Sequence, residues 1–165
     1  MKIRNGFVSN SSSSSYIIAY KLDKPCKHCG RSDFDVKKFI DERNVEFSKT
    51  KLTMKTTKEV VEFLKEEIQQ STDYLAPFYE AAKNGDKEIK TNWGTVEVSS
   101  TIQSSEEELA SIENLLTLVL EYKEKDNWNV INAEIATDDK VTINAINSLI
   151  ASNHAAILDV DTNQF

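Results

Sequence analysis

The stretch WNVINAEIATDDKVTINAINSLIASNHAAILDV, residues 128–160, decides the fold class of this chain. Alternating apolar residues predict a strand over 128–136, and an acidic turn followed by apolar residues at helical spacing predicts a helix over 139–152. A short apolar run predicts a closing strand over 155–160. Because a strand, a helix and a strand of these lengths form a βαβ unit, we expect the two strands to pair in parallel through a right-handed crossover. Five residues are expected to face inward from the helix: Val141, Ala145, Ile146, Leu149 and Ile150.

The middle of the chain predicts two helices separated by an acidic cap. Thr57 begins the first of them. Its apolar residues recur at helical spacing: Val60, Val61, Leu64 and Ile68. Asp73 is expected to cap a second helix over 74–83, which Gly85 ends because glycine tolerates the left-handed backbone conformation.

A β-hairpin and a long helix are expected next. Residues 87–100 predict the hairpin, with its turn at 92–94. Ser104 and Ser105 are each followed three residues later by a glutamate, so they form overlapping capping boxes that predict the start of a helix. This helix has an apolar stripe: Leu109, Ile112, Leu116, Val119 and Leu120.

The N-terminal region contains a serine run, in the sequence GFVSNSSSSSYII at residues 6–18. Strands are expected over 2–8 and 16–22, on either side of the run. Serine has little apolar surface to bury and offers hydroxyls for hydrogen bonding, so we expect a displayed loop. The loop residues are Ser11, Ser12, Ser13, Ser14 and Ser15. The alternatives for this loop are a modification or cleavage target, a recognition tag, an anion-binding loop and a plain polar connector. The anion-binding loop is the weakest of these, because the segment lacks glycines.

These elements predict an α+β fold with a mixed sheet in one domain over 1–165. Residues 1–22 would hold the strands with the serine loop, and residues 23–33 a cysteine-bearing loop. No apolar run approaches the roughly 20 residues of a membrane span, and the N-terminus lacks the apolar core of a secretory signal. We therefore expect a cytoplasmic protein that does not act at a membrane.

The net charge of −7 is unevenly distributed. Residues 1–55 hold 12 Lys/Arg and 6 Asp/Glu, which gives +6, and residues 56–165 hold 8 and 21, which gives −13. Plain solubility explains such a difference, and so does an interaction surface. The overall acidity argues against nucleic-acid binding, whereas the acidic half could imitate nucleic acid toward a basic partner. Whether the chain forms a homo-oligomer is left open by the sequence.

Cys26 and Cys29 form a Pro-Cys-x-x-Cys-Gly pattern that resembles half of a zinc knuckle. Tetrahedral zinc needs four ligands and a second such pair is missing, so His154, nearby aspartates or a partner chain would complete the shell. Unliganded thiols are an equal alternative. A redox role ranks lower, because the residues after Cys29 interrupt the helix start that a thioredoxin-like motif needs.

The sequence offers little for catalysis. It contains no glycine-rich phosphate loop, no nucleophile elbow and no His-Glu-x-x-His motif. His154 stands at the expected end of the last helix, where a cation offsets the helix dipole. These observations favour a protein without enzymatic activity.

Three stretches resemble a family of uncharacterised small proteins, many of them encoded by bacteriophages. The stretches are Lys2 to Asn10 with the serines that follow, the Cys-x-x-Cys-Gly-Arg segment from Cys26 to Asp33, and the late strand and helix from Val130 to Ile157. Family members often carry a Tyr-His-Asp-Glu-like turn after the late strand, whereas this chain has Ala-Thr-Asp-Asp at 136–139. The resemblance implies a phage or prophage origin and no particular activity.

The leading hypothesis is a non-enzymatic phage or prophage accessory protein that binds a host or virion protein through the serine loop. In the first alternative, a modifying or processing enzyme acts on Ser11–Ser15. In the second, the chain is a zinc-dependent or nucleic-acid-mimicking interaction module.

Overall fold

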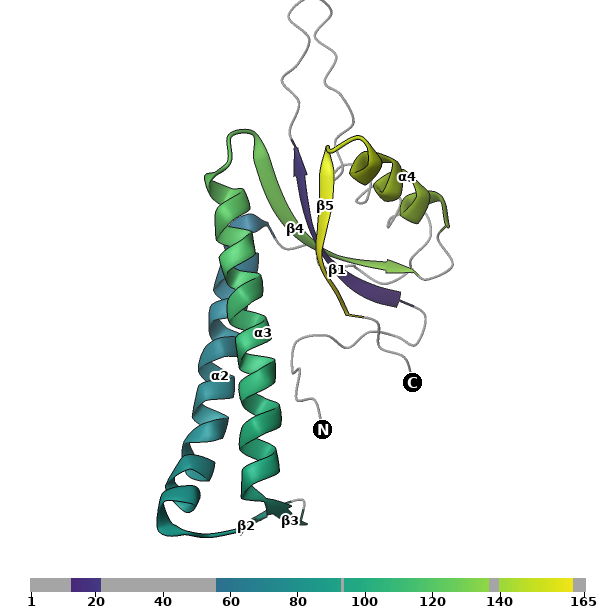
Figure 1. Cartoon of the computed structure of the whole chain (residues 1–165). Helices are drawn as coiled ribbons and strands as arrows, with labels where there is room; N and C mark the ends of the chain where they lie inside the picture. Colours follow the sequence, from purple (N-terminus) through teal and green to yellow (C-terminus); the bar gives the residue numbers. More distant parts are fainter. Residues whose placement is uncertain (1–12, 22–55, 93, 137–139, 162–165) are drawn as a thin grey trace, which may run out of the picture. The chain divides into compact units, whose positions relative to one another are not determined.

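The computed structural model describes residues 13–21, 56–92, 94–136 and 140–161 (Figure 1). Its elements are β1 (Ser13–Lys21), α2 (Thr57–Asn84), β2 (Glu88–Thr91), β3 (Gly94–Glu97), α3 (Val98–Glu124), β4 (Trp128–Ala136), α4 (Lys140–Ala151) and β5 (Ala155–Asp161). The combination of helices with antiparallel sheets confirms the α+β class. The expected strand over 2–8 and the cysteine loop over 23–33 lie outside the described residues.

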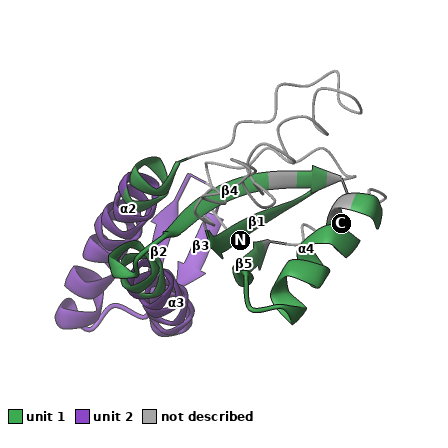
Figure 2. Ribbon diagram, turned by 90° about the horizontal axis from the view of Figure 1, so that it is seen from above, with its two compact units in different colours: residues 1–61, 118–165 green, residues 62–117 purple. Residues whose placement is uncertain are grey.

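The chain divides into two compact units (Figure 2). Residues 1–61 and 118–165 form the first, which we call the sheet unit, and residues 62–117 form the second, which we call the hairpin unit. The division falls inside α2 and α3. A single domain over the whole chain stays a prediction.

The sheet unit contains three described strands in the order β4-β1-β5, and β1 pairs antiparallel with both neighbours. The order of strand, helix and strand over 128–161 is confirmed, but the parallel pairing of its two strands is wrong, because β1 lies between them. The strands that the structure describes pair only antiparallel, so they do not form the expected mixed sheet. Two strand spacings of about 4.8 Å match the diameter of about 10 Å of the α4 crossover, so a third strand fits between β4 and β5. β1 suits that place because its residues 17–20 are apolar and buried on both faces.

Helix α4 covers one face of this sheet. The buried residues of this core are Ile18, Tyr20, Ile131, Ala133, Ile135, Ile146 and Ala155, with Tyr16, Ile143, Leu149 and Ile150 packed against them. The expected inward position of Val141 is wrong, since its side chain is 58% exposed. Ile143 contacts the core instead, because it lies three residues before Ile146 on the same helical stripe.

The outer edge of β4 is capped by one side chain. The Thr57 hydroxyl donates to the Val130 carbonyl at 2.9 Å and accepts from the Val130 N–H at 2.8 Å, as a neighbouring strand would. Thr56, just before, forms a capping box with Glu59, whose carboxylate accepts from the Thr56 N–H at 2.7 Å. Helix α2 therefore begins at Thr57, as predicted, with its first residue fixed to the sheet.

In the hairpin unit, α2 and α3 run side by side in opposite directions, and β2 and β3 connect their ends (Figure 1). The expected cap at Asp73 is wrong, because α2 continues through it and through Pro77 to Asn84. Asp73 accepts a hydrogen bond from the side-chain amide of Gln69 at 2.8 Å, one turn earlier, so its carboxylate is used on the helix surface. Gly85 ends the helix with a φ of 82°, as expected.

The β-hairpin is confirmed, with Glu88–Thr91 paired to Gly94–Glu97. The capping boxes at Ser104 and Ser105 are wrong, since α3 begins six residues earlier at Val98. Hydroxyls in the first turn of α3 hydrogen-bond to Glu97 instead. Thr101, for example, donates to the Glu97 carbonyl at 2.7 Å. Ser104 lies in the second turn of α3, and its hydroxyl donates to the Thr101 carbonyl.

Helix α4 ends in a Schellman motif. The N–H of His154 donates to the Leu149 carbonyl at 2.8 Å, and the N–H of Asn153 donates to the Ile150 carbonyl at 3.0 Å. Asn153 adopts the left-handed conformation that this motif requires, with a φ of 59°. Lys21 then donates its N–H to the His154 carbonyl, which joins the turn to β1.

Candidate functional site

The serine run ends inside the sheet. Strand β1 begins at Ser13, three residues before the expected start, and pairs with β4 from Ser13 onward. Ser14 and Ser15 are 4% and 5% exposed. The expected display is therefore wrong for these two residues, because a central strand is covered by neighbours on both edges and both faces. Ser11 and Ser12 lie outside the described residues.

Within the described part of the chain, two buried polar atoms of the sheet have no hydrogen-bond partner: the Ser15 Oγ and the Asn132 Nδ2. Asn132 is paired with Ile17, and Ile17 lies two residues after Ser15 on the same strand, so the two polar residues are diagonal neighbours on one sheet face. An unsatisfied buried polar group costs about 1–3 kcal/mol. Such groups in a sheet core call for an explanation.

The predicted metal ligands are not brought together in the described structure. Cys26 and Cys29 lie outside the described residues. His154 follows α4, and its Nδ1 lies 3.0 Å from the Ser152 Oγ. Among the side chains that the structure describes, no three His, Cys, Asp or Glu residues form a group that could hold a metal. Zinc binding by the cysteines stays a prediction.

Negative charge is concentrated in the hairpin unit. Residues 62–117 hold 12 Asp/Glu and 4 Lys/Arg, which gives −8, and the rest of the chain holds 15 and 16, which gives +1. Most of these acidic side chains are exposed: Glu62, Glu66, Asp73, Glu80, Asp86, Glu88, Glu97, Glu106, Glu107 and Glu113. The acidity of the whole protein is thus a property of one unit.

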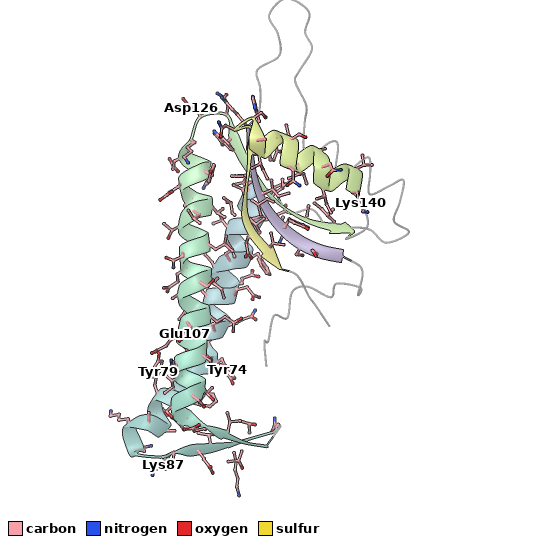
Figure 3. All side chains as sticks on the ribbon, turned by 45° about the vertical axis from the view of Figure 1, so that its right-hand side comes forward. Tyr74, Tyr79, Lys87, Glu107, Asp126 and Lys140 are labelled. Atoms are coloured by element: carbon pink, nitrogen blue, oxygen red, sulfur yellow. The ribbon has the colours of Figure 1, made fainter. Side chains whose placement is uncertain are left out.

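Exposed tyrosines interrupt this acidic surface (Figure 3). Tyr74 is 41% and Tyr79 is 45% exposed, although both lie on α2 beside buried positions such as Leu75 and Phe78. The Tyr74 ring packs against the Phe78 ring with their centroids 5.2 Å apart. These two tyrosines therefore expose apolar ring surface at fixed positions.

A hydrogen bond joins the two long helices of the hairpin unit at Tyr79. Its hydroxyl donates to the Glu106 Oε1 at 2.6 Å, a short, charge-assisted bond. This hydrogen bond, followed by burial and by the negative charge of Glu106, raises the pKa of Tyr79 above its ordinary value of 10.0. The bond holds the ring in one orientation and keeps the carboxylate beside it.

Only part of this site was predictable from the sequence. The surplus of acidic residues in the second half of the chain was visible in the charge distribution, but the boundaries of the unit over 62–117 were not. The Tyr79–Glu106 pair had no signal in the sequence, because 27 residues separate its members.

Comparisons with known proteins do not assign the chain to a family. No protein-family model matches it, and no curated protein or solved structure is similar enough to match. Of the helices that the structure describes, none combines the length and apolar character needed to cross a membrane.

Proposed function

We propose that this chain is a non-enzymatic binding protein whose hairpin unit docks onto a basic surface of a partner protein. The concentration of the net charge, −8 over residues 62–117 against +1 elsewhere, is the observation that supports this function best. Charge complementarity of this kind steers association and selects partners by sign.

The exposed tyrosines favour a protein-binding role over plain solubility. Solubility needs carboxylates, but it does not need large ring surfaces placed among them. Tyrosine is enriched at interfaces, because its ring buries much area and loses few rotamers when it is bound. Tyr79 is additionally held by Glu106 before a partner arrives, which lowers the entropy cost of binding.

Other parts of the original hypothesis stay predictions. Binding or modification through the serines now concerns chiefly Ser11 and Ser12, since Ser14 and Ser15 are buried. A phage or prophage origin, a host or virion partner and a cytoplasmic location belong to the same proposal.

The test is chemical cross-linking of the full-length protein in an extract of the cells that make it, with cross-linked peptides identified by mass spectrometry. We expect cross-links from residues 62–117 to a basic partner. The affinity is then measured with that purified partner at two salt concentrations, and we expect weaker binding at the higher one.

Two triple variants with the same loss of charge separate the hairpin unit from the rest. Glu106→Gln, Glu107→Gln and Glu113→Gln together should weaken binding by roughly tenfold or more. The matched control is Glu121→Gln, Glu124→Gln and Asp126→Asn, three exposed acidic residues of the sheet unit. Equal losses in the two variants, or cross-links confined to residues outside 62–117, would contradict the proposal.

A further inference from the structure

The sheet face opposite α4 changes from apolar to polar toward the Ser13 end of β1. Ile17 and Ser15 share this face, because side chains alternate along a strand and Ile18 and Tyr20 face α4. In the two ladders, Ile17 is paired with Asn132 on β4 and with Asp159 on β5. One row of the face therefore holds an amide, an isoleucine and a carboxylate.

Acidic residues occupy the next row at the level of Ser15. The register places Glu134 of β4 and Asp161 of β5 directly opposite Ser15, one in each ladder. Three acidic residues thus stand at strand positions around one buried serine: Glu134, Asp159 and Asp161. Glu134 and Asp161 flank Ser15 from the two strands on either side of β1, and Asp159 lies two residues before Asp161 on β5.

The unpartnered atoms lie within this same group of positions. The Ser15 Oγ and the Asn132 Nδ2 belong to residues that are 5% and 2% exposed, and neither atom has a hydrogen-bond partner among the residues that the structure describes. A hydroxyl can accept as well as donate, and a carboxamide can turn to present its oxygen in place of its nitrogen. Both residues can therefore supply an oxygen to a ligand.

We propose that Ser15, Asn132 and Asp159 contribute to a binding site for a hard divalent cation on this face, with Glu134 and Asp161 at the adjoining register positions. Hydroxyl, carboxamide and carboxylate oxygens are the donors that Mg²⁺, Ca²⁺ and Mn²⁺ take. A cation would take the unpartnered Ser15 Oγ and, with the carboxamide turned, the oxygen of Asn132, and its charge would be favourable beside the Asp159 carboxylate. An anion would be repelled by the Asp159 carboxylate, and a single water would not offset its charge.

The experiment is thermal unfolding of the full-length protein with MgCl₂, CaCl₂ or MnCl₂ in the low millimolar range, against choline chloride at the same ionic strength. At least one cation should raise the Tm by about 5 °C, because a ligand that binds only the folded state stabilises it. Binding of Mn²⁺ is measured on the same samples by water-proton relaxation, which reports the metal directly.

Ser15→Ala separates a ligand site from a packing defect. Without metal its Tm should equal or exceed that of the unsubstituted protein, because an unsatisfied hydroxyl is removed. With metal, its Tm rise should be smaller and its Kd for Mn²⁺ higher by roughly tenfold. Asp159→Asn should weaken binding similarly, whereas the matched Asp126→Asn, in the exposed turn after α3, should bind as the unsubstituted protein does.

Three results would overturn the site. The first is that no cation raises the Tm above the choline control. The second is that Ser15→Ala keeps the full cation-induced rise. The third is that Asp126→Asn loses as much affinity as Asp159→Asn, which would show that cations bind diffusely to surface carboxylates. If Ser15→Ala does not fold, the two aspartate variants still decide between these outcomes.

Discussion

The sheet unit and the hairpin unit distribute apolar and charged residues in opposite ways. In the sheet unit, the central strand β1 is buried on both faces and the unit's net charge is only +1. In the hairpin unit, the buried residues include Leu75, Phe78 and Ile112, and the unit has a net charge of −8 and two exposed tyrosines. Substitutions in the sheet unit should therefore mainly affect stability, and those in the hairpin unit should mainly affect binding to a partner protein.

The largest expected effect is that of Ile18→Ala in β1. Ile18 has no exposed surface and belongs to the core under α4, so its truncation should lower the free energy of unfolding by about 3–4 kcal/mol. Urea unfolding followed by circular dichroism measures this value. The matched control is Val141→Ala on α4, which is 58% exposed and should change stability by less than about 0.5 kcal/mol. Equal losses of stability in the two variants would contradict the packing of α4 described above, in which Val141 is exposed.

Thr57→Val tests the cap on the β4 edge. It keeps the shape of the side chain but removes the hydroxyl that bonds both main-chain groups of Val130, so we expect a loss of about 2 kcal/mol. Thr57→Ser keeps the hydroxyl and should lose much less. Hydrogen exchange at the Val130 amide, measured by NMR, should accelerate only in the valine variant. An unchanged exchange rate there would show that the threonine does not protect the edge.

Asn153→Ala should cost about 1 kcal/mol in the same unfolding assay. The reason is the φ of 59° at Asn153, a conformation that alanine adopts only with strain. Asn153→Gly relieves this strain and should leave stability nearly unchanged. A destabilised glycine variant would instead assign the effect to the asparagine side chain.

The smallest expected effect is the pH dependence from Tyr79. Its pKa is raised in the folded protein above 10.0, so the folded state holds the phenolic proton more tightly than the unfolded chain. This contribution to stability is complete below pH 10 and disappears as the pH rises through the raised pKa. In Glu106→Gln the pKa of Tyr79 should fall toward 10.0, which NMR titration of the ring signals can follow. No change would show that the hydrogen bond does not form in solution.

Local patterns predicted the elements well, because the information lay within each segment. The alternation around Ile131 and Ile135 gave the bounds of β4, and Thr57 was identified as the start of α2. The strand order was not predictable, since nothing within residues 128–161 indicates that β1 lies between their two strands. Ser104 and Thr56 begin the same four-residue capping pattern, but only Thr56 stands where a helix begins.

The candidate surface was only partly predictable for the same reason. Composition located the acidic half of the chain, and the structure showed that residues 62–117 of it form a separate unit with a net charge of −8. Ser15 and Asn132 were assigned to different segments, and only the register between β1 and β4 makes them neighbours.

The central place of β1 also determines when the sheet can form during protein synthesis. Its partners in the sheet, β4 and β5, are encoded more than a hundred codons later, so β1 leaves the ribosome long before either can pair with it. At about 5–20 residues per second, the delay is on the order of ten seconds. During that interval all five serines of the run are accessible on the nascent chain, including the two that the finished sheet conceals.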